Sequence, residues 1–486
     1  MLFNSYIFIF LFLPVALAGY YGFSCLKLYR LSNLFLIGMS LWFYGYFNKK
    51  YLLLICGSIM VNFLISKIMA YQERKNLKKL LLILGICINI AIIFYFKYYD
   101  FFIQNFNAVF GKSFELKNIA LPLGISFFSF QQISYMVDSY MGETKDYRID
   151  EYALFVSFFP QLIAGPIVLH SEMIPQFRNQ ENHRIIPKNF SKGMYVFAFG
   201  LFKKVLIADT FGKAVTLGFG AVETLSSMEA FIVSLSYTFQ LFFDFSGYCD
   251  MALGIGYMFN VELPANFNSP YKATSIVEFW ERWHMSLTRF LRTYIYIPLG
   301  GNRKSRIRTY FNIMMVYLVS GIWHGANWTF ILWGLLHGIL SCLNRLFRKQ
   351  WEKLGEITKW VVTFMTVNML WVLFRAENIS SSILFMKEMC CLSSFSVREE
   401  LYNCFRLTEF SIIEEKIGFL NYLPSRITGF HLWIFIIGAF FAVLNLHNSK
   451  EIDFKPSVAK SLLTVIFMLW SVVSLSGISI FLYFDF

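Results

Sequence analysis

The sequence predicts an all-α integral membrane protein that crosses the membrane many times. Hydrophobic residues make up 57% of the 486 positions and aromatic residues 20%, so the chain holds more apolar surface than one soluble core could bury. Apolar stretches of membrane-spanning length recur along its whole length, without a fixed-period repeat. We therefore expect one domain, residues 1–486, with roughly eleven to thirteen membrane segments.

The apolar stretches are joined by connections that are mostly short. Two longer polar connections, near 170–190 and 392–429, are expected to lie at or outside a membrane surface. No Lys or Arg precedes the first stretch, so we interpret it as an uncleaved span. The candidate spans are 5–23, 31–48, 51–70, 80–98, 119–141, 151–169, 191–217, 228–259, 309–343, 357–374, 430–446 and 457–483.

Charge and cysteine content exclude two classes of function. The net charge of +13 is spread over the connections between spans, which is typical of orientation in a membrane and argues against a nucleic-acid partner. The eight cysteines show no CxxC or other metal-ligand spacing. We therefore predict no metal cofactor.

Two apolar stretches are too long for simple spans. Residues 309–343 would form a helix of about 52 Å, against a hydrocarbon core of about 30 Å. We expect a break at "SGIWHGAN", where Gly321 and Gly325 lower helix propensity and Asn327 can bond freed backbone groups. A second break is expected in 228–260 at "FDFSGYCDM". Irregular backbone at membrane depth needs protein or a water-filled cavity around it, so both breaks indicate a shared site.

Three histidines are candidate site residues. His324 lies at the first break beside Trp323, and an ionisable residue at that depth is by default functional, although a neutral imidazole could simply satisfy a carbonyl. His337 follows thirteen residues later and would face elsewhere on a continuous helix, which favours a supporting role. His284 lies in "SIVEFWERWHMSLTRFLRTYIYIPLGGNRKSRIR", a segment typical of an interfacial helix with a charged face.

Charged residues near both breaks leave alternatives open. In the same interfacial segment, the basic residues Arg282, Arg303 and Lys304 could hold the phosphates of a cytoplasmic donor, or could only set the topology. Asp244, Ser246, Tyr248 and Asp250 of "FDFSGYCD" could form a cation or proton path, as in a transporter, or Asp244 could orient an imidazole. The transporter hypothesis lacks detectable inverted repeats.

Motifs along nearly the whole chain resemble those of the membrane-bound O-acyltransferase family. The resemblance is strongest to the bacterial type, the membrane component of alginate O-acetylation and its relatives for peptidoglycan and other polysaccharides. It rests on the order and spacing of "LPLGISFFSFQQISYMVDSY", "FFPQLIAGPI", "YTFQLFFDFSGYCDMALGIGYMFN", "LPANFNSPYKATSIVEFWERWHMSL", "YIYIPLGGNR", "GIWHGANWTFILWGLLHG" and "WVLFRAEN".

The resemblance implies a fold and a reaction. The fold would be a ring of tilted and broken helices around a central funnel, in a bacterial cytoplasmic membrane. The reaction would be acyl transfer from acetyl-CoA, with His324 as the catalytic histidine and His284 as a second functional histidine facing the tunnel. One would act as general base and the other would position the acyl carbonyl. A variant of this hypothesis is transfer of D-alanine to teichoic acid, with a carrier protein as the donor.

The final residues, "GISIFLYFDF", add a candidate acyl carrier. Tyr483 could be an interfacial tyrosine. The ending also resembles a short tyrosine-containing motif of cell-envelope acylation systems, in which a phenol accepts the acyl group. In such systems an extracytoplasmic serine esterase-like partner of the SGNH type completes the transfer to polysaccharide. The chain has no GxSxG elbow, so we expect this last step to belong to a partner.

Overall fold

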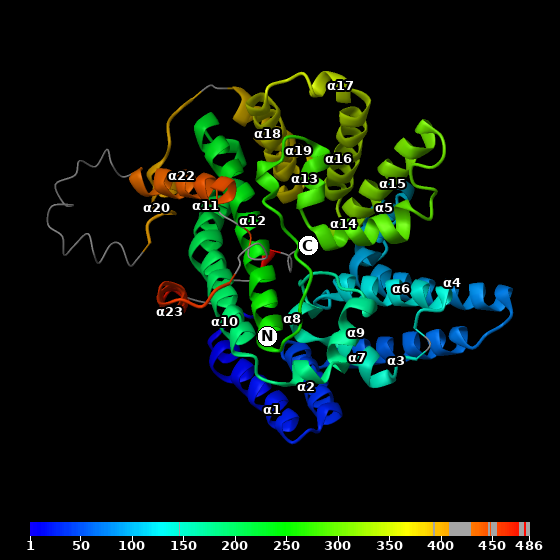
Figure 1. Ribbon diagram of the computed structural model, residues 1–486. Helices are drawn as coiled ribbons and strands as arrows, with labels where there is room; N and C mark the ends of the chain where they lie inside the picture. Colours follow the sequence, from blue (N-terminus) through cyan, green and yellow to red (C-terminus); the bar gives the residue numbers. More distant parts are fainter. Residues whose placement is uncertain are drawn as a thin grey trace.

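A computed structural model describes residues 1–144, 146–391, 394–407, 429–445, 448, 454–475 and 481–482. Within these ranges the chain is helical and has no strand, which confirms the predicted all-α class. Figure 1 shows helices grouped on all sides of α12, the longest of them. The amino-terminal helices are α1 (Leu13–Cys25), α2 (Tyr29–Gly45), α3 (Lys50–Ala70), α4 (Lys75–Ile93), α5 (Tyr99–Phe110) and α6 (Ile125–Met141).

Short helices follow where the sequence suggested a single span over 151–169. The structure divides this stretch into α7 (Ile149–Ser157) and α8 (Phe159–Leu162). Phe158 separates them, because its ψ of 109° is not helical. A helix of nine residues is about 14 Å long and does not cross a bilayer. The polar connection after it contains α9 (His170–Arg178).

A long helical hairpin forms the centre of the molecule. Its first arm is α10 (Pro187–Phe202), a π-helical segment η4 (Lys203–Ala208) and α11 (Asp209–Phe219). Its second arm is α12 (Ser227–Met258). The predicted break at "FDFSGYCDM" is wrong, because α12 runs through it without interruption. Nearly every residue of α12 is buried by protein, so the helix need not match the thickness of a bilayer.

The predicted break at "SGIWHGAN" is confirmed. Helix α15 (Arg306–His324) ends at the histidine, and α16 (Trp328–Leu346) returns beside it. Before this hairpin lie α13 (Ile276–Arg282), α14 (Met285–Leu291) and the π-helical η7 (Arg292–Tyr296). After it come α17 (Arg348–Trp351), α18 (Glu356–Arg375), α19 (Ile379–Cys391), α20 (Glu399–Asn403), α22 (Phe430–Asn445) and α23 (Val458–Val473).

Five helical stretches among the described residues are long and apolar enough to span a membrane: Phe8–Cys25, Lys50–Ala70, Lys75–Phe110, Trp328–Leu346 and Glu356–Arg375. Two shorter apolar helices, Phe430–Asn445 and Val458–Val473, accompany them. Several of the other predicted spans are thus shorter or irregular helices. The protein is a multi-pass membrane protein whose interior helices are buried by protein rather than by lipid.

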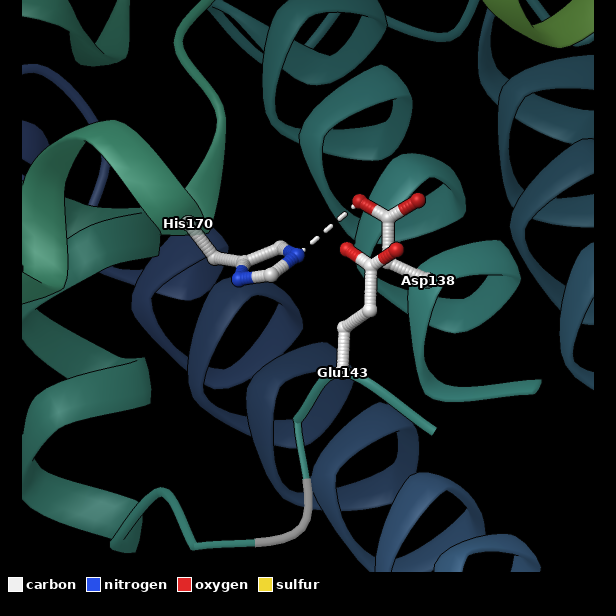
Figure 2. A group of neighbouring side chains, drawn as sticks. All are labelled: Asp138, Glu143 and His170. Atoms are coloured by element: carbon white, nitrogen blue, oxygen red, sulfur yellow. Dashed lines mark hydrogen bonds and ion pairs between the residues drawn. The ribbon is translucent and has the colours of Figure 1, made fainter. Parts of the chain in front are cut away.

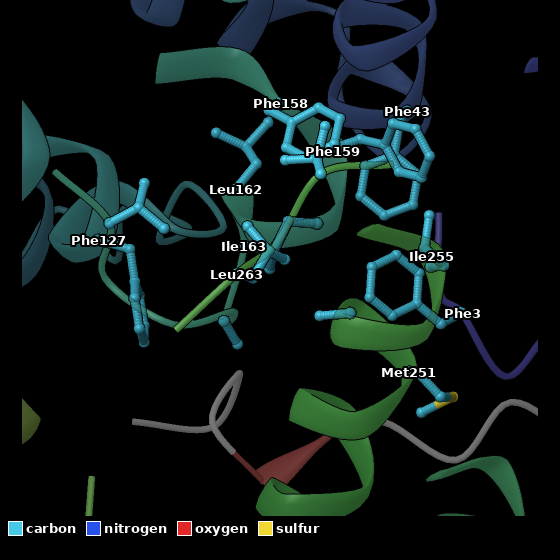
Figure 3. Close-up of a cluster of buried hydrophobic side chains, with 14 of the residues drawn as sticks. Phe3, Phe43, Phe127, Phe158, Phe159, Leu162, Ile163, Met251, Ile255 and Leu263 are labelled. Carbon is cyan, nitrogen blue, oxygen red and sulfur yellow. The ribbon is translucent and has the colours of Figure 1, made fainter. Parts of the chain in front are cut away.

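Two large apolar clusters pack against opposite parts of α12. In the first, the amino-terminal Phe3 lies against Met251 and Ile255 of α12, with Phe43 and Phe159 around them (Figure 3). The second cluster joins α12 to α13, α16 and α18. This helix therefore connects the amino-terminal helices with the hairpin that carries His324.

Candidate active site

His324 is the last residue of α15, and a lysine from a distant helix closes that helix end. Lys97 lies in the π-helical segment η2 (Phe94–Tyr98) between α4 and α5. Its Nζ donates to the carbonyl oxygens of Trp323 at 2.7 Å and His324 at 2.9 Å. Carbonyls in the last turn of a helix have no partner within the helix, and a cation there also complements the helix dipole. Lys97 therefore stabilises the break that exposes His324 to the interior.

The imidazole of His324 lies among aromatic rings. Ring centroids of Trp323, Trp333 and Phe374 lie 4.9, 5.2 and 5.1 Å from it. His324 also lines a small cavity of about 30 Å³, together with Lys97 and Ser126. This volume is about that of one water molecule. His324 is only 5% exposed, and a site shielded from water is the environment in which electrostatic effects on a reaction are largest.

His284 comes from a different part of the chain and reaches the same aromatic cluster. Its ring lies 4.9 Å from that of Phe245 and 5.9 Å from that of Trp323. Because Trp323 also contacts His324, one indole joins the two histidines. The backbone of His284 is left-handed, with φ 45° and ψ 50°, between α13 and α14. A non-glycine residue in this conformation costs about 1–3 kcal/mol and is most frequent at functional sites.

The third histidine, His337, is held by a hydrogen bond. Its Nδ1 accepts a hydrogen bond from Trp280 Nε1 at 3.1 Å, and its ring lies 4.8 Å from that of Trp333. Trp333 thus contacts both His324 and His337. His337 is not among the residues that line the small cavity.

Asn327 and the glycines of the break have separate tasks. The Asn327 side chain accepts from Thr329 N–H at 3.1 Å, which caps α16, and donates to the Glu377 carbonyl at 2.8 Å. It therefore bonds one backbone group freed at the break, the Thr329 N–H, as the sequence suggested, and it also links the break to Glu377, which follows α18. Gly321 faces Gly334 across the α15–α16 hairpin, where an added Cβ would lie 2.4 Å from the Phe330 carbonyl oxygen. Small residues at this crossing let the two helices approach closely.

The acidic residues of "FDFSGYCD" pair with lysines of η4. Asp244 lies 2.6 Å from Lys204 Nζ, and Asp250 lies 2.6 Å from Lys203 Nζ. The second oxygen of Asp244 accepts the backbone N–H of Leu482. Thus the described partners of Asp244 are a lysine and a backbone amide rather than an imidazole. Ser246 lines a cavity of about 330 Å³ between α10, α12 and α22, and Tyr248 packs against the rings of Phe3 and Phe481.

A large charged cleft of about 950 Å³ opens where α13, α15, α16 and α17 meet. Its basic side chains are Arg306, Arg345, Arg348, Lys349 and Lys359. Of the residues suggested for donor binding, Arg282 is paired with Glu278 at 2.8 Å. Arg303 and Lys304 are exposed in the loop before α15 and do not line the charged cleft. Tyr483 lies outside the described residues.

A separate cluster of titratable side chains lies at the far end of α6. Figure 2 shows His170 pointing at Asp138, with Glu143 beside them. His170 Nε2 lies 2.9 Å from Asp138 Oδ2, and the Tyr294 hydroxyl donates to the same oxygen at 2.9 Å. These bonds connect α6, α9 and η7. The cluster therefore has a structural explanation that is independent of His324.

The sequence analysis missed two lysines, Lys97 and Lys204. Lys97 is the one cation of the largely apolar run "IIFYFKYYD", and Lys204 belongs to the adjacent pair Lys203–Lys204 of "GLFKKVLIAD". A buried charge within a membrane segment is a signal of function. That signal could have identified both residues, although it could not have identified their partners.

Comparison with known proteins identifies the family of the chain. The model of the membrane-bound O-acyltransferase family matches residues 36–385. The chain is 41% identical to the peptidoglycan O-acetyltransferase of Helicobacter pylori, over 100% of this chain and 98% of that protein. It is 42% identical to the probable alginate O-acetylase AlgI of Pseudomonas aeruginosa, over 78% and 73% of the two chains.

A more distant relative is the teichoic acid D-alanyltransferase of Streptococcus thermophilus, which is 27% identical over 52% of this chain and 68% of that protein. All three relatives are named for adding an acyl group: O-acetylation of peptidoglycan or alginate, or D-alanylation of teichoic acid. Family match, identity and helical architecture agree. The chain belongs to the membrane-bound O-acyltransferase family and is a multi-pass membrane acyltransferase.

Proposed function

We propose that this protein moves acetyl groups from cytoplasmic acetyl-CoA across the bacterial cytoplasmic membrane for O-acetylation of a cell-envelope or exported polysaccharide. The observation that carries the proposal is the buried His324 at a lysine-capped helix end, in a chain 41% identical over its full length to a peptidoglycan O-acetyltransferase. The acceptor sugar is reached through an SGNH-type serine esterase-like partner outside the membrane. Tyr483 carries the acetyl group between the two.

The charged cleft supports a cytoplasmic anionic donor. Among the described residues, Arg306, Arg345 and Lys349 in the cleft have no carboxylate partner. Guanidinium and ammonium groups left unpaired in a cleft are suited to the phosphates of a coenzyme. Arg303 and Lys304 do not line the cleft, but they lie in the loop just before Arg306, which does, and they remain candidates for this contact.

A narrower apolar cavity of about 120 Å³ lies between α13, α14 and α15. Trp280, Tyr317 and Ser320 line it, and Ser320 precedes His324 by one helical turn. Trp280 also belongs to α13, the helix whose Glu278 and Glu281 line the charged cleft. Helix α13 therefore borders both the charged cleft and this cavity, which supports a route for a thioester arm from the cleft towards His324.

The chemistry assigned to His324 is that of a general base. His324 accepts the proton of the Tyr483 phenol, and the phenol oxygen forms a bond to the acetyl carbonyl carbon. The carbon–sulfur bond of the thioester breaks, and the coenzyme thiol leaves with the proton from His324. His284, reached through Trp323, positions the carbonyl oxygen and stabilises its developing charge. The partner's serine then takes the acetyl group, and Tyr483 recovers its proton.

Transfer of D-alanine from a carrier protein is the second candidate, supported by the 27% identity to a teichoic acid D-alanyltransferase. The higher identity and coverage of the two O-acetylating relatives favour acetyl transfer. A transporter is disfavoured by family membership and by the pairing of Asp244 and Asp250 with lysines.

The test uses purified protein in nanodiscs with radiolabelled acetyl-CoA. Wild type, His324→Ala and Tyr483→Phe are compared for label on the protein. We expect label that requires both residues. Label that survives Tyr483→Phe would overturn the tyrosine relay, and label that survives His324→Ala would overturn the general base. A wild type that stays unlabelled with its partner present, but is labelled by a D-alanyl carrier protein, would favour the second candidate.

A further inference from the structure

A buried ion pair lies outside the chemistry assigned so far. The Lys204 and Asp244 side chains are only 2% and 3% exposed, and Lys204 also contacts Asp209 at 2.8 Å. Removing two charges from water is costly, and such pairs within membrane proteins are by default functional. Packing of α10 against α12 does not depend on this pair, because the two helices are already in close contact along their length. The pair therefore calls for a separate explanation.

Local structure brings these two residues together at a defined point. Lys204 lies in the π-helical segment η4, and π-helical turns are frequent at functional sites. Gly200 and Gly247 face each other at this crossing, and a Cβ on Gly247 would lie 2.8 Å from the Gly200 carbonyl oxygen. This close approach places Lys204 Nζ within 2.6 Å of Asp244 Oδ1.

The other oxygen of Asp244 binds a segment 238 residues away. Asp244 Oδ2 accepts the backbone N–H of Leu482 at 3.1 Å. The preceding residue, Phe481, is 1% exposed, and its ring lies 4.6 Å from that of Tyr248 and 4.8 Å from Lys204 Nζ. One carboxylate thus connects the central hairpin to the segment 481–482.

The same turn of α12 also reaches the histidines. Phe245 follows Asp244 directly, and its ring lies 4.9 Å from that of His284. Adjacent residues on a helix point about 100° apart, so Asp244 and Phe245 face two sides of one turn. The bound segment and His284 therefore lie on neighbouring faces of α12.

We propose that Lys204 and Asp244 form an anchor pair that fixes Leu482, and that acyl transfer through Tyr483, the next residue in the sequence, depends on this anchor. This inference rests on the proposed function, in which Tyr483 carries the acetyl group. Tyr483 directly follows Leu482 in the sequence, so we expect its reaction to be sensitive to loss of the bond between Asp244 and the Leu482 amide. Lys204 and Asp244 are positioning residues: the ion pair with Lys204 orients the Asp244 side chain, and Asp244 binds the Leu482 amide.

The chain supplies a matched control for the test. Lys203 and Asp250 form a neighbouring pair on the same two segments, also at 2.6 Å, and Leu482 is not among their described partners. The double variants Lys204→Met/Asp244→Leu and Lys203→Met/Asp250→Leu each replace an ion pair by apolar side chains, an exchange that folded proteins often tolerate. Leu482→Pro, which removes the N–H, is compared with Leu482→Ala, which keeps it.

Two measurements are made in nanodiscs: acetyl label on Tyr483, and hydrogen exchange of the Leu482 amide. We expect Lys204→Met/Asp244→Leu and Leu482→Pro to lower the label at least tenfold, and the former to speed exchange at least tenfold. Lys203→Met/Asp250→Leu and Leu482→Ala should stay within threefold of wild type. Equal behaviour of the two double variants would overturn the anchor. An unlabelled wild type would overturn the relay instead, and exchange alone would then decide whether the pair holds the segment.

Discussion

The ammonium group of Lys97 donates a hydrogen bond to the carbonyl oxygen of His324, 227 residues further along the chain. The contact joins the long α4–η2–α5 helix to the break in α15. It satisfies backbone groups that would otherwise lie unpaired beside the small cavity. The position of the candidate base thus depends on a residue that takes no part in the proposed chemistry.

Replacing Lys97 by Met should lower both stability and acetyl transfer. Two buried carbonyls would lose their donor, at a cost of about 1–3 kcal/mol each, and the last turn of α15 would loosen. We expect a lower thermal unfolding temperature in detergent and at least a tenfold loss of activity. Lys112→Met, at an exposed lysine beyond α5, serves as control. Wild-type activity in Lys97→Met would contradict the role given to this contact.

At His284, glycine should be a more stable replacement than alanine, which is the reverse of the usual order. Alanine is normally better tolerated than glycine within ordered structure, but φ 45° favours glycine. We therefore expect His284→Gly to unfold at a higher temperature than His284→Ala, although it removes more atoms. Both variants should lose transfer activity because the imidazole is gone. If alanine proves the more stable, the left-handed backbone is not a source of strain.

Asn327 should matter for activity more than another helix cap does. Losing an N-cap side chain typically costs about 1 kcal/mol, and Asn327→Ala also loses the bond to the Glu377 carbonyl. Ser457→Ala removes a comparable cap, at the start of α23. We expect both to lower the unfolding temperature slightly and only Asn327→Ala to slow acetyl transfer. Equal rates for the two variants would argue against coupling between this cap and the site.

The crossing of α10 and α12 can be tested at Gly247. Alanine in place of a helical glycine ordinarily stabilises by about 1 kcal/mol. At Gly247 the new Cβ would meet the Gly200 carbonyl oxygen, whereas at Gly57 in α3 it would meet nothing within 4 Å. Gly247→Ala should therefore lower the unfolding temperature and Gly57→Ala should not. A stabilised Gly247→Ala protein would show that the helices can separate without cost.

The break at His324 could be predicted because the apolar stretch around it is longer than the hydrocarbon core of a bilayer is thick. An apolar stretch of residues 309–343 cannot be one span, and Asn327 marks the point where the next helix begins. The same reasoning failed for α12. Its length is accommodated because protein surrounds it, and Gly247 serves helix packing rather than a break. Sequence alone does not distinguish these two uses of glycine.

Contacts between distant segments could not be predicted. His284 and His324 share Trp323, Lys97 reaches the end of α15, and Asp244 binds Leu482. Each contact depends on how helices cross, which local patterns do not encode. The left-handed backbone of His284 is likewise imposed by its surroundings, since nothing in "ERWHMSL" requires it. The histidines themselves were identified because ionisable residues are rare in apolar segments.

The most direct test of the account measures the initial rate of coenzyme thiol release from acetyl-CoA by wild type, His324→Gln and His337→Gln. Both variants replace a buried histidine of the same hairpin, but only His324 adjoins the small cavity. Loss of a general base typically slows a reaction about 10²- to 10⁴-fold. We predict such a loss for His324→Gln, and a rate within about fivefold of wild type for folded His337→Gln. A His324→Gln enzyme that releases thiol at the wild-type rate would contradict the central claim.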